Sequence, residues 1–400
     1  MRILQLSNKS PFPPNDGSSI AIANLALGFA DNEVDLHLLS INTKKHYKAD
    51  DKIDDLIKEK TNYQSVYKNT NTSIVGAFLN LFSNQSYFVS RFYFNDFKNI
   101  LIKKLQSQTF DVIQIEGIFM ASYIPTIKKY SEAKIVLRAH NIEHQIWDRL
   151  LLQEKSWIKK QYVSLQNKRL TQFELKVFQK CDAIVTITDD DKKNIQADIP
   201  NQKIETCLTG INLSDYAYVD KVIKPNTLFH FASMDWMPNV EAVNWLLDNV
   251  WNDVVKEIPD AKLILAGNGM PYFIKQKKSK NIEVIEHVQN SSEFYKTYDI
   301  MLVPLWSGSG LRIKLVEGLA YGKPIISTSI GAEGIPYEHN HHMMIADTKK
   351  EFINAIIELI KNESIKIKLQ KSARELAETE FDYKKIAKKL ILFYSDLLKS

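Results

Sequence analysis

The stretch 303–331 limits the folds open to this chain more than any other segment, because it places a glycine loop between a strand and a helix. An apolar run at 300–305 has the length and composition of a buried strand. A loop of small residues follows, and then a helical pattern that Gly322 and Pro324 end in the usual order. Such a loop leaves backbone N–H groups exposed at the positive end of a helix, where a phosphate can bind.

Two cations, Arg312 and Lys314, stand at the start of this helix, where a positive charge is electrostatically unfavourable. Their presence favours a bound anion, and the alternative is that each is an ordinary surface cation. On a helix the two side chains would point about 200° apart, so only a distorted backbone would aim both at one anion. Glu317, further along, is placed to accept hydrogen bonds from sugar or ribose hydroxyls. Its alternative role is a plain ion pair with Lys314.

Strand and helix patterns alternate twice along the chain, which is typical of two doubly wound α/β domains with a cleft between them. The loop before the first helix contains Gly17, which allows a close backbone approach to a ligand, but it lacks the G-x-G-x-x-G dinucleotide fingerprint. The stretch 213–225 has no dense apolar pattern and is the expected linker. We therefore predict a first domain over 1–215 and a second over 216–382, followed by an amphipathic helix at 383–400.

Polar residues follow the expected strand at 134–138, where His140, Asn141 and Glu143 occur close together. Because α/β sheets place their sites at the C-terminal ends of strands, His140 is a candidate contact to a sugar or an acceptor. The alternative is a purely structural histidine. Asn141 and Glu143 are further candidates at the same place.

The composition excludes several classes of function. The net charge of +5 is too small for a nucleic-acid-binding balance and suits anionic substrates or an anionic membrane surface. The 2 cysteines have neither disulfide nor metal-site spacing, and the acidic run 189–191 has the position of a helix cap, so we expect no metal site. No apolar run is long enough for a signal peptide or a membrane-spanning helix, which predicts a cytoplasmic protein.

The section 74–94 is rich in aromatic residues and contains Arg91. One interpretation is that it lies against a membrane interface. The other is that it forms core and the wall of an acceptor-binding cleft, with Arg91 as an acceptor contact.

Taken together, the motifs resemble the GT-B glycosyltransferases, in particular the family-four retaining nucleotide-sugar transferases (glycosyl transferases group 1). The resemblance covers nearly the whole chain. It rests on the Gly17 loop, the runs 138–143, 210–212 and 234–239 and, most specifically, the run 308–324.

The resemblance implies a nucleotide-sugar donor bound by the second domain, an acceptor bound by the first, and a last helix that packs back on the first domain. It assigns the donor ribose contact to Glu317 and the base-contacting loop to Val288. Ser309 stands where the family has another glutamate, as in a subgroup that reads Gly-Ser-Gly-x-Arg-x-Lys. The catalytic candidates are His140, Arg312 and Glu317; the donor-binding candidates are Gly17, Gly267, Val288, Ser309, Gly310, Leu311, Arg312, Lys314 and Glu317; the acceptor-binding candidates are Asn141, Glu143 and Arg91.

The implied function is glycosyl transfer with retention to a glycan or lipid-linked acceptor, in cell-surface polysaccharide biosynthesis, without metal or cofactor. Peripheral contact with the inner face of the cell membrane would suit such an acceptor. Two alternatives stay open. The missing glutamate at Ser309 allows a non-catalytic sugar-nucleotide-binding protein. A dinucleotide-dependent oxidoreductase shares the domain type, although the absent glycine fingerprint speaks against it.

Overall fold

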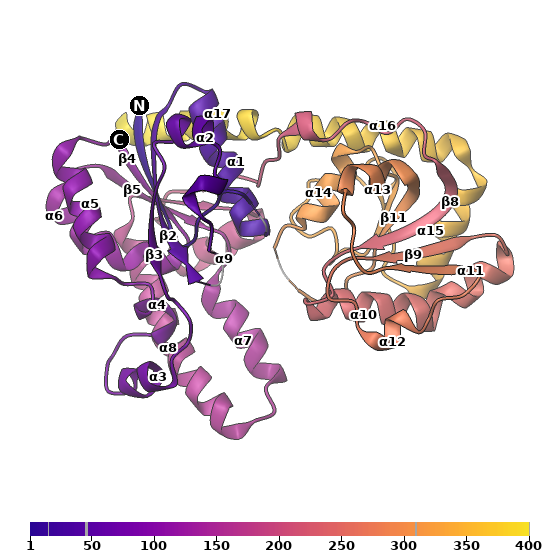
Figure 1. The fold of residues 1–400 in the computed structure, drawn as a ribbon, viewed down its shortest axis with the longest axis horizontal. Coiled ribbons are helices and arrows are strands. Elements are labelled where there is room, and N and C mark those ends of the chain that lie inside the picture. The colour runs from indigo at the N-terminus through magenta and orange to yellow at the C-terminus, as the bar shows by residue number, and fades with distance from the viewer. Residues whose placement is uncertain (15, 45–46, 309, 400) are drawn as a thin grey trace. The chain divides into compact units, whose positions relative to one another are not determined.

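The computed structural model describes residues 1–14, 16–44, 47–308 and 310–399. The chain divides into two compact units: unit 1 comprises Met1–Gly210 with Tyr383–Ser400, and unit 2 comprises Ile211–Asp382. The sequence placed the division after residue 215. Each unit is a parallel sheet with helices, so the predicted α/β fold of two doubly wound domains is confirmed (Figure 1). Within the described residues, no helix combines the length and apolarity needed to cross a membrane.

Unit 1 is built around a sheet whose described strands follow the order β3-β2-β1-β4-β5-β6-β7, all of them parallel. Its elements are β1 (Arg2–Ser7), α1 (Gly17–Asp31), β2 (Asp35–Thr43), η2 (Asp50–Lys52), α2 (Asp55–Lys60), β3 (Gln64–Lys68), α3 (Ile74–Asn80), α4 (Tyr87–Ser90), α5 (Asn95–Ser107), β4 (Val112–Glu116), η3 (Ile118–Tyr123), α6 (Ile124–Tyr130), β5 (Lys134–Ala139), α7 (Glu143–Gln153), α8 (Trp157–Lys180), β6 (Ala183–Thr186), α9 (Asp189–Asp198), β7 (Ile204–Thr206) and α17 (Tyr383–Lys399).

The two faces of this sheet carry separate cores, because alternate residues of a strand point to opposite faces. On β1, Leu4 and Leu6 pack into one core with residues of α5, α6 and α8. Ile3 packs into the other core with residues of α1 and α17. Strands buried on both faces explain why the sequence shows continuous apolar runs here.

The last helix, α17, belongs to unit 1 and packs against α1 (Figure 1). Two glycines allow the close approach. A Cβ at Gly28 would lie 2.7 Å from both Ala387 Cβ and Tyr383 O, and one at Gly210 would lie 2.6 Å from Tyr383 Cα. The hydroxyl of Tyr383 also bonds to Asp31 at 2.5 Å. These contacts bring residues from the two ends of the chain into one core.

Unit 2 has a parallel sheet whose described strands follow the order β10-β9-β8-β11-β12-β13. Its elements are η4 (Leu213–Asp215), β8 (Lys224–Phe231), α10 (Met237–Trp245), η5 (Leu246–Val250), α11 (Trp251–Glu257), β9 (Lys262–Ala266), α12 (Tyr272–Lys275), β10 (Ile282–Ile285), α13 (Ser291–Thr297), β11 (Tyr298–Val303), α14 (Ile313–Ala320), β12 (Ile325–Ser327), β13 (Met344–Ile345), α15 (Lys349–Lys361) and α16 (Glu363–Glu380).

Candidate functional site

In unit 1, the C-terminal ends of three neighbouring strands bring one buried carboxylate, Glu116, together with His140. Glu116 ends β4, and its Oε2 lies 2.6 Å from His140 Nε2 and 3.6 Å from Arg138 Nη1. Its Oε1 accepts hydrogen bonds from Gln5 Nε2, at 2.5 Å, and from Gln114 Nε2. Both Glu116 and Arg138 have almost no exposed surface, whereas 14% of the His140 side chain is exposed.

The charge state of Glu116 fixes the tautomer of His140. Burial alone would raise the pKa of Glu116, but the Arg138 charge and the His140 and Gln5 hydrogen bonds outweigh it and lower the pKa to about 2. Burial also lowers the pKa of His140, although its bond to Glu116 opposes that shift. An ionised carboxylate only accepts hydrogen bonds, so neutral His140 donates from Nε2 and keeps a lone pair on Nδ1. That nitrogen can accept a hydrogen bond from a hydroxyl.

Asn141 and Glu143 lie beside His140, as the sequence predicts for the end of β5. Burial, and then the charge of Glu174 on α8, raise the pKa of Glu143 to about 7. A hydrogen bond from Asn141 and the positive charge of Lys9 oppose the shift. Glu143 is therefore a carboxyl group that both donates and accepts hydrogen bonds near neutral pH.

Gly17 is the first residue of α1, and Asp16 caps that helix by accepting from the Ser19 backbone N–H at 2.8 Å. Lys9 forms an ion pair with Asp16 at 3.0 Å and also acts on the pKa values of His140 and Glu143. The loop after β1 therefore supplies a cation to the same strand-end cluster.

Arg91 lies elsewhere in unit 1. Its Nη1 donates to Thr72 Oγ1 at 3.2 Å, and its guanidinium lies 5.0 Å from the centre of the Phe92 ring. These contacts join Arg91, at the end of α4, to the segment before α3, so the structure does not group it with His140. Its role as an acceptor contact stays a prediction.

In unit 2, Glu317 on α14 lines a cavity of about 390 Å³. The other residues lining it are Asp215, Tyr216, Gln289, Asn290, Ser291, Ser292 and Tyr321. Tyr216 and Tyr321 meet edge to face, with ring centres 5.2 Å apart. Burial first, and also the Glu317 charge, raise the pKa values of both tyrosines, so both remain neutral phenols. A carboxylate, aromatic rings and hydroxyl groups thus surround one space.

The cations at the start of α14 point in different directions. Arg312 precedes the helix as its N-cap, in extended conformation, and its guanidinium lies 5.2 Å from the centre of the Trp236 ring. Its Nη2 is 3.8 Å from Glu333 Oε2. Lys314 is in the first turn, where Nζ bonds to Glu317 Oε2 at 2.7 Å and lies 4.4 Å from the centre of the Phe231 ring. Of the two cations that the sequence places at the start of this helix, Arg312 is extended and only Lys314 is helical.

The remaining donor candidates occupy loops after strands of unit 2. Gly267, at φ 137°, follows β9, and a Cβ there would lie 1.7 Å from Ala232 O. Its close approach is thus to the protein's own backbone. Val288 is half-buried and directly precedes the cavity residue Gln289. Gly310, at φ 83°, and the half-buried Leu311 precede α14. Ser309 lies outside the described residues.

Comparison with known proteins agrees with this geometry. Residues 225–362, which contain α14 and its residue Glu317, match the glycosyl transferases group 1 family. A 44.6 kDa protein from the cps region of Klebsiella pneumoniae is 25% identical in an alignment of 315 residues that covers 73% of this chain and 79% of that protein.

Solved structures match over the whole chain. Sucrose-phosphate synthase from Thermosynechococcus elongatus has a TM-score of 0.70 at 13% identity and covers 100% of both chains. The pneumococcal O-GlcNAc transferase GtfA, in complex with UDP and GlcNAc, has a TM-score of 0.65 at 14% identity, covering 100% of this chain and 99% of that one. At such low identity the likeness shows the fold alone.

The family match over residues 225–362 and the fold of the two units identify a glycosyltransferase with the GT-B fold. Sequence reasoning missed several residues of this glycosyltransferase that the structure groups with the candidates. Glu116 is one, although its place at the end of a buried strand was the same signal that selected His140. Lys9 carried no local signal. Tyr321 is the C-cap of α14, the helix that carries Glu317, whereas Tyr216 is distant in the sequence and only the fold places it beside Glu317.

Among the described residues, no group of three or more His, Cys, Asp or Glu side chains could hold a metal ion. The acidic run 189–191 instead forms the first turn of α9, whose cap is Thr188. Negative charge there is favourable because it faces the positive end of the helix.

Proposed function

We propose that this glycosyltransferase moves a sugar from a UDP-sugar to a glycan or lipid-linked acceptor, with retention of the anomeric configuration. The observation that carries the proposal is the cavity in unit 2 where Glu317 lies beside Tyr216 and Tyr321. A buried carboxylate suits the paired hydroxyls of a ribose, and tyrosine rings suit the face of a base. The likeness of the fold to a transferase that holds UDP supports uridine as the base.

The diphosphate would bind at the start of α14. Exposed backbone N–H groups and the positive end of the helix favour an anion there. Lys314 adds a charge, since 41% of its side chain is exposed and its Nζ can turn from Glu317 to a phosphate. Arg312, held against Trp236, would add a second charge from the preceding loop. We propose that these groups stabilise the negative charge of the leaving diphosphate without a metal ion.

The acceptor would bind unit 1, at the strand-end cluster of His140, Asn141 and Glu143. Nδ1 of neutral His140 accepts a hydrogen bond from a sugar hydroxyl, while Glu116 holds the ring in place. Such a role makes Glu116 a positioning residue. The relative from a cps region supports a polysaccharide or its lipid-linked precursor as the acceptor. We propose that the protein meets such an acceptor at the inner face of the cell membrane.

Retention requires that the new bond form on the face that the diphosphate leaves. In the step we propose, the bond from the sugar's anomeric carbon to the phosphate oxygen breaks, and the bond to the acceptor oxygen forms on the same side. The proton of the acceptor hydroxyl moves to the departing phosphate oxygen. No protein side chain is needed as the base, and the cations at α14 stabilise the charge that develops on the diphosphate.

Nucleotide binding tests the proposal. Unfolding temperatures of the wild type would be measured with UDP, GDP, ADP and CMP, beside the variant Glu317→Ala. A ligand at 100 times its dissociation constant adds about 2.7 kcal/mol of stability. We expect a shift with UDP that Glu317→Ala loses. The matched control, Glu338→Ala, changes an exposed carboxylate of the same unit and should keep the shift. A wild type that responds to no nucleotide would contradict the proposal.

A further inference from the structure

Helix α3 in unit 1 exposes an apolar surface that a water-facing helix does not normally carry. Its four large apolar side chains, together with Phe82 just beyond it, lie in solvent: Ile74 is 88% exposed and Phe82 82%. The helix has no charged residue. Contiguous exposed apolar side chains of this kind mark an interaction site. The set, named here the α3 surface, is Ile74, Val75, Phe78, Leu79 and Phe82.

The α3 surface is held by hydrogen bonds that fix its end to α8. Arg169 on α8 donates from Nη1 to Asn80 O and from Nη2 to Leu81 O, both at 3.1 Å. Gln166 Nε2 donates to Asn80 Oδ1 at 3.0 Å. The structure thus divides the aromatic section 74–94: Phe88 and Phe92 enter the core, while the α3 surface remains outside.

A second exposed apolar set lies where α7 and α8 meet, at a tip that Figure 1 shows extending from unit 1. Leu152 is 84% exposed, Trp157 72% and Ile158 75%. Exposed lysines accompany them, at 155, 159 and 160. Tryptophan, aliphatic side chains and lysine together are the composition of segments that lie in a lipid headgroup layer.

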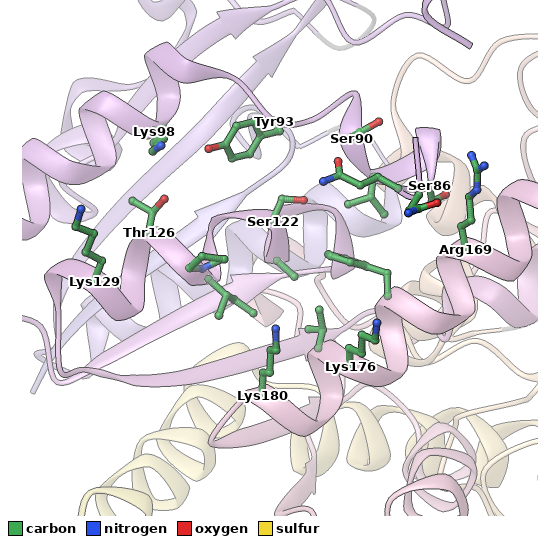
Figure 2. Close-up of a pocket in the computed structure, with 18 of the residues that line it drawn as sticks. Ser86, Ser90, Tyr93, Lys98, Ser122, Thr126, Lys129, Arg169, Lys176 and Lys180 are labelled. Atoms are coloured by element: carbon green, nitrogen blue, oxygen red, sulfur yellow. The ribbon is translucent and has the colours of Figure 1, made fainter. Parts of the chain in front are cut away.

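Arg169 also connects the α3 surface to a basic groove of about 770 Å³ between α8 and the helices α5 and α6. Five cations line this groove, and no carboxylate does among the described lining residues. Lys176 and Lys180 extend into it from α8, and Lys129 lies on the α6 side (Figure 2). The cations are Lys98, Lys129, Arg169, Lys176 and Lys180.

We propose that unit 1 docks on an anionic membrane surface, with the α3 surface and the α7–α8 tip entering the lipid and the groove lysines binding the phosphate headgroups. Charge complementarity selects this occupant. A symmetric dimer through the α3 surface would bring two copies of the same basic groove close together, and their like charges would repel. Anionic lipid satisfies both the apolar and the cationic parts of the surface.

Vesicle binding of the full chain tests this without any need for turnover, so its failure is separate from failure of the proposed transfer. The wild type should sediment with vesicles of phosphatidylglycerol and phosphatidylcholine, far less with phosphatidylcholine alone, and should be released by salt. Phe78→Ser with Phe82→Ser should weaken binding by about tenfold or more. Lys129→Ala, Lys176→Ala and Lys180→Ala together should remove the preference for the anionic lipid.

Matched controls lie on unit 2. Ile223→Ser with Tyr272→Ser changes two exposed apolar side chains, and Lys277→Ala, Lys278→Ala and Lys280→Ala change three exposed lysines. Both should bind vesicles like the wild type, and all variants should keep the wild-type unfolding temperature. Absence of vesicle binding, or equal loss in the controls, would overturn the proposal. So would a dimer of the wild type in sedimentation velocity that Phe78→Ser with Phe82→Ser converts to monomer.

Discussion

Nε2 of His140 lies 2.6 Å from Oε2 of Glu116, at the ends of the adjacent strands β5 and β4. Around this pair, Gln5, Gln114 and Arg138 complete the coordination of the carboxylate. Tyr394 of α17 donates to Gln114 Oε1, so the last helix supports the same network. The arrangement holds one imidazole at the surface in a defined orientation.

Glu116→Gln should destabilise unit 1 by about 3 kcal/mol, because it leaves the buried Arg138 guanidinium without its counter-charge. The amide N–H₂ of the glutamine would also face Gln5, Gln114 and His140, which already donate hydrogen bonds to this position, so it could not replace the second carboxylate oxygen. Denaturant unfolding followed by tryptophan fluorescence would measure the change. Glu132→Gln, at an exposed position of the same unit, should change stability by less than about 0.5 kcal/mol. A Glu116→Gln protein as stable as the wild type would show that the network contributes little.

The stability of the fold should depend on pH through Glu143. Its pKa is about 7 when folded, above the ordinary value of 4.5, so the folded state holds the proton more tightly. Stability is then greatest below pH 4.5 as far as this group is concerned, and is lost as pH rises through 7. Glu143→Gln should therefore match the wild type at pH 4.5 and exceed it by about 3 kcal/mol at pH 8. Equal stability of the two proteins at pH 8 would refute the assignment.

Lys314→Met should raise the KM for the nucleotide-sugar by about tenfold or more, because it removes a charge from the proposed diphosphate site. The ion pair with Glu317 contributes only about 0.3 kcal/mol, so stability should hardly change. Steady-state kinetics would give the KM. Lys349→Met, at the first residue of α15 in the same unit, is the matched control and should leave the KM unchanged. A wild-type KM in the Lys314→Met enzyme would show that this lysine is an ordinary surface cation and does not bind the diphosphate.

Gly28→Ala should loosen the attachment of α17. In an open helix this change stabilises by about 0.5–1 kcal/mol, but here the new methyl would meet Ala387 Cβ and Tyr383 O at 2.7 Å. The crowding should cost about 1–3 kcal/mol instead. Hydrogen exchange of α17 would rise in the variant. Adding Ala387→Gly to this variant removes one of the two contacts and should restore part of the protection. If Gly28→Ala alone caused no rise in exchange, α17 would accommodate the methyl group without loosening.

Much of the fold follows from local patterns in the sequence. The strand expected at 134–138 is β5 (Lys134–Ala139), and the amphipathic helix expected from residue 383 is α17 (Tyr383–Lys399), since each has a clear pattern. Helix α7 ends at Gln153, a boundary that no local pattern indicates. Glu154 Oε1 then accepts a hydrogen bond from Ser156 N at 2.9 Å, and α8 begins at Trp157. Edge strand β3 was missed because half-exposed residues there show no apolar run.

The candidate site was predictable only where one segment carries it. Lys314 was selected as a candidate because it begins a helix, Glu317 because it lies further along that helix, and His140 because it follows a strand. The groups that surround Glu116, the partner of His140, come from the strands β1, β4 and β5. The cavity residues at 215–216 and 289–292 are distant from Glu317 in the sequence. Only the packed sheet brings them together. The direction of Arg312 likewise depends on Trp236, a contact that no local pattern reveals.

The most direct test of the central claim is transfer itself. Wild type and Glu317→Ala would be incubated with UDP-sugars and a lipid extract rich in phosphate-linked glycans, while release of UDP is measured and the product is examined by proton NMR. We predict UDP release in step with a new glycosidic bond that keeps the configuration of the donor, reduced about a hundredfold or more in Glu317→Ala. An inverted product, or UDP release that does not depend on Glu317, would contradict the account.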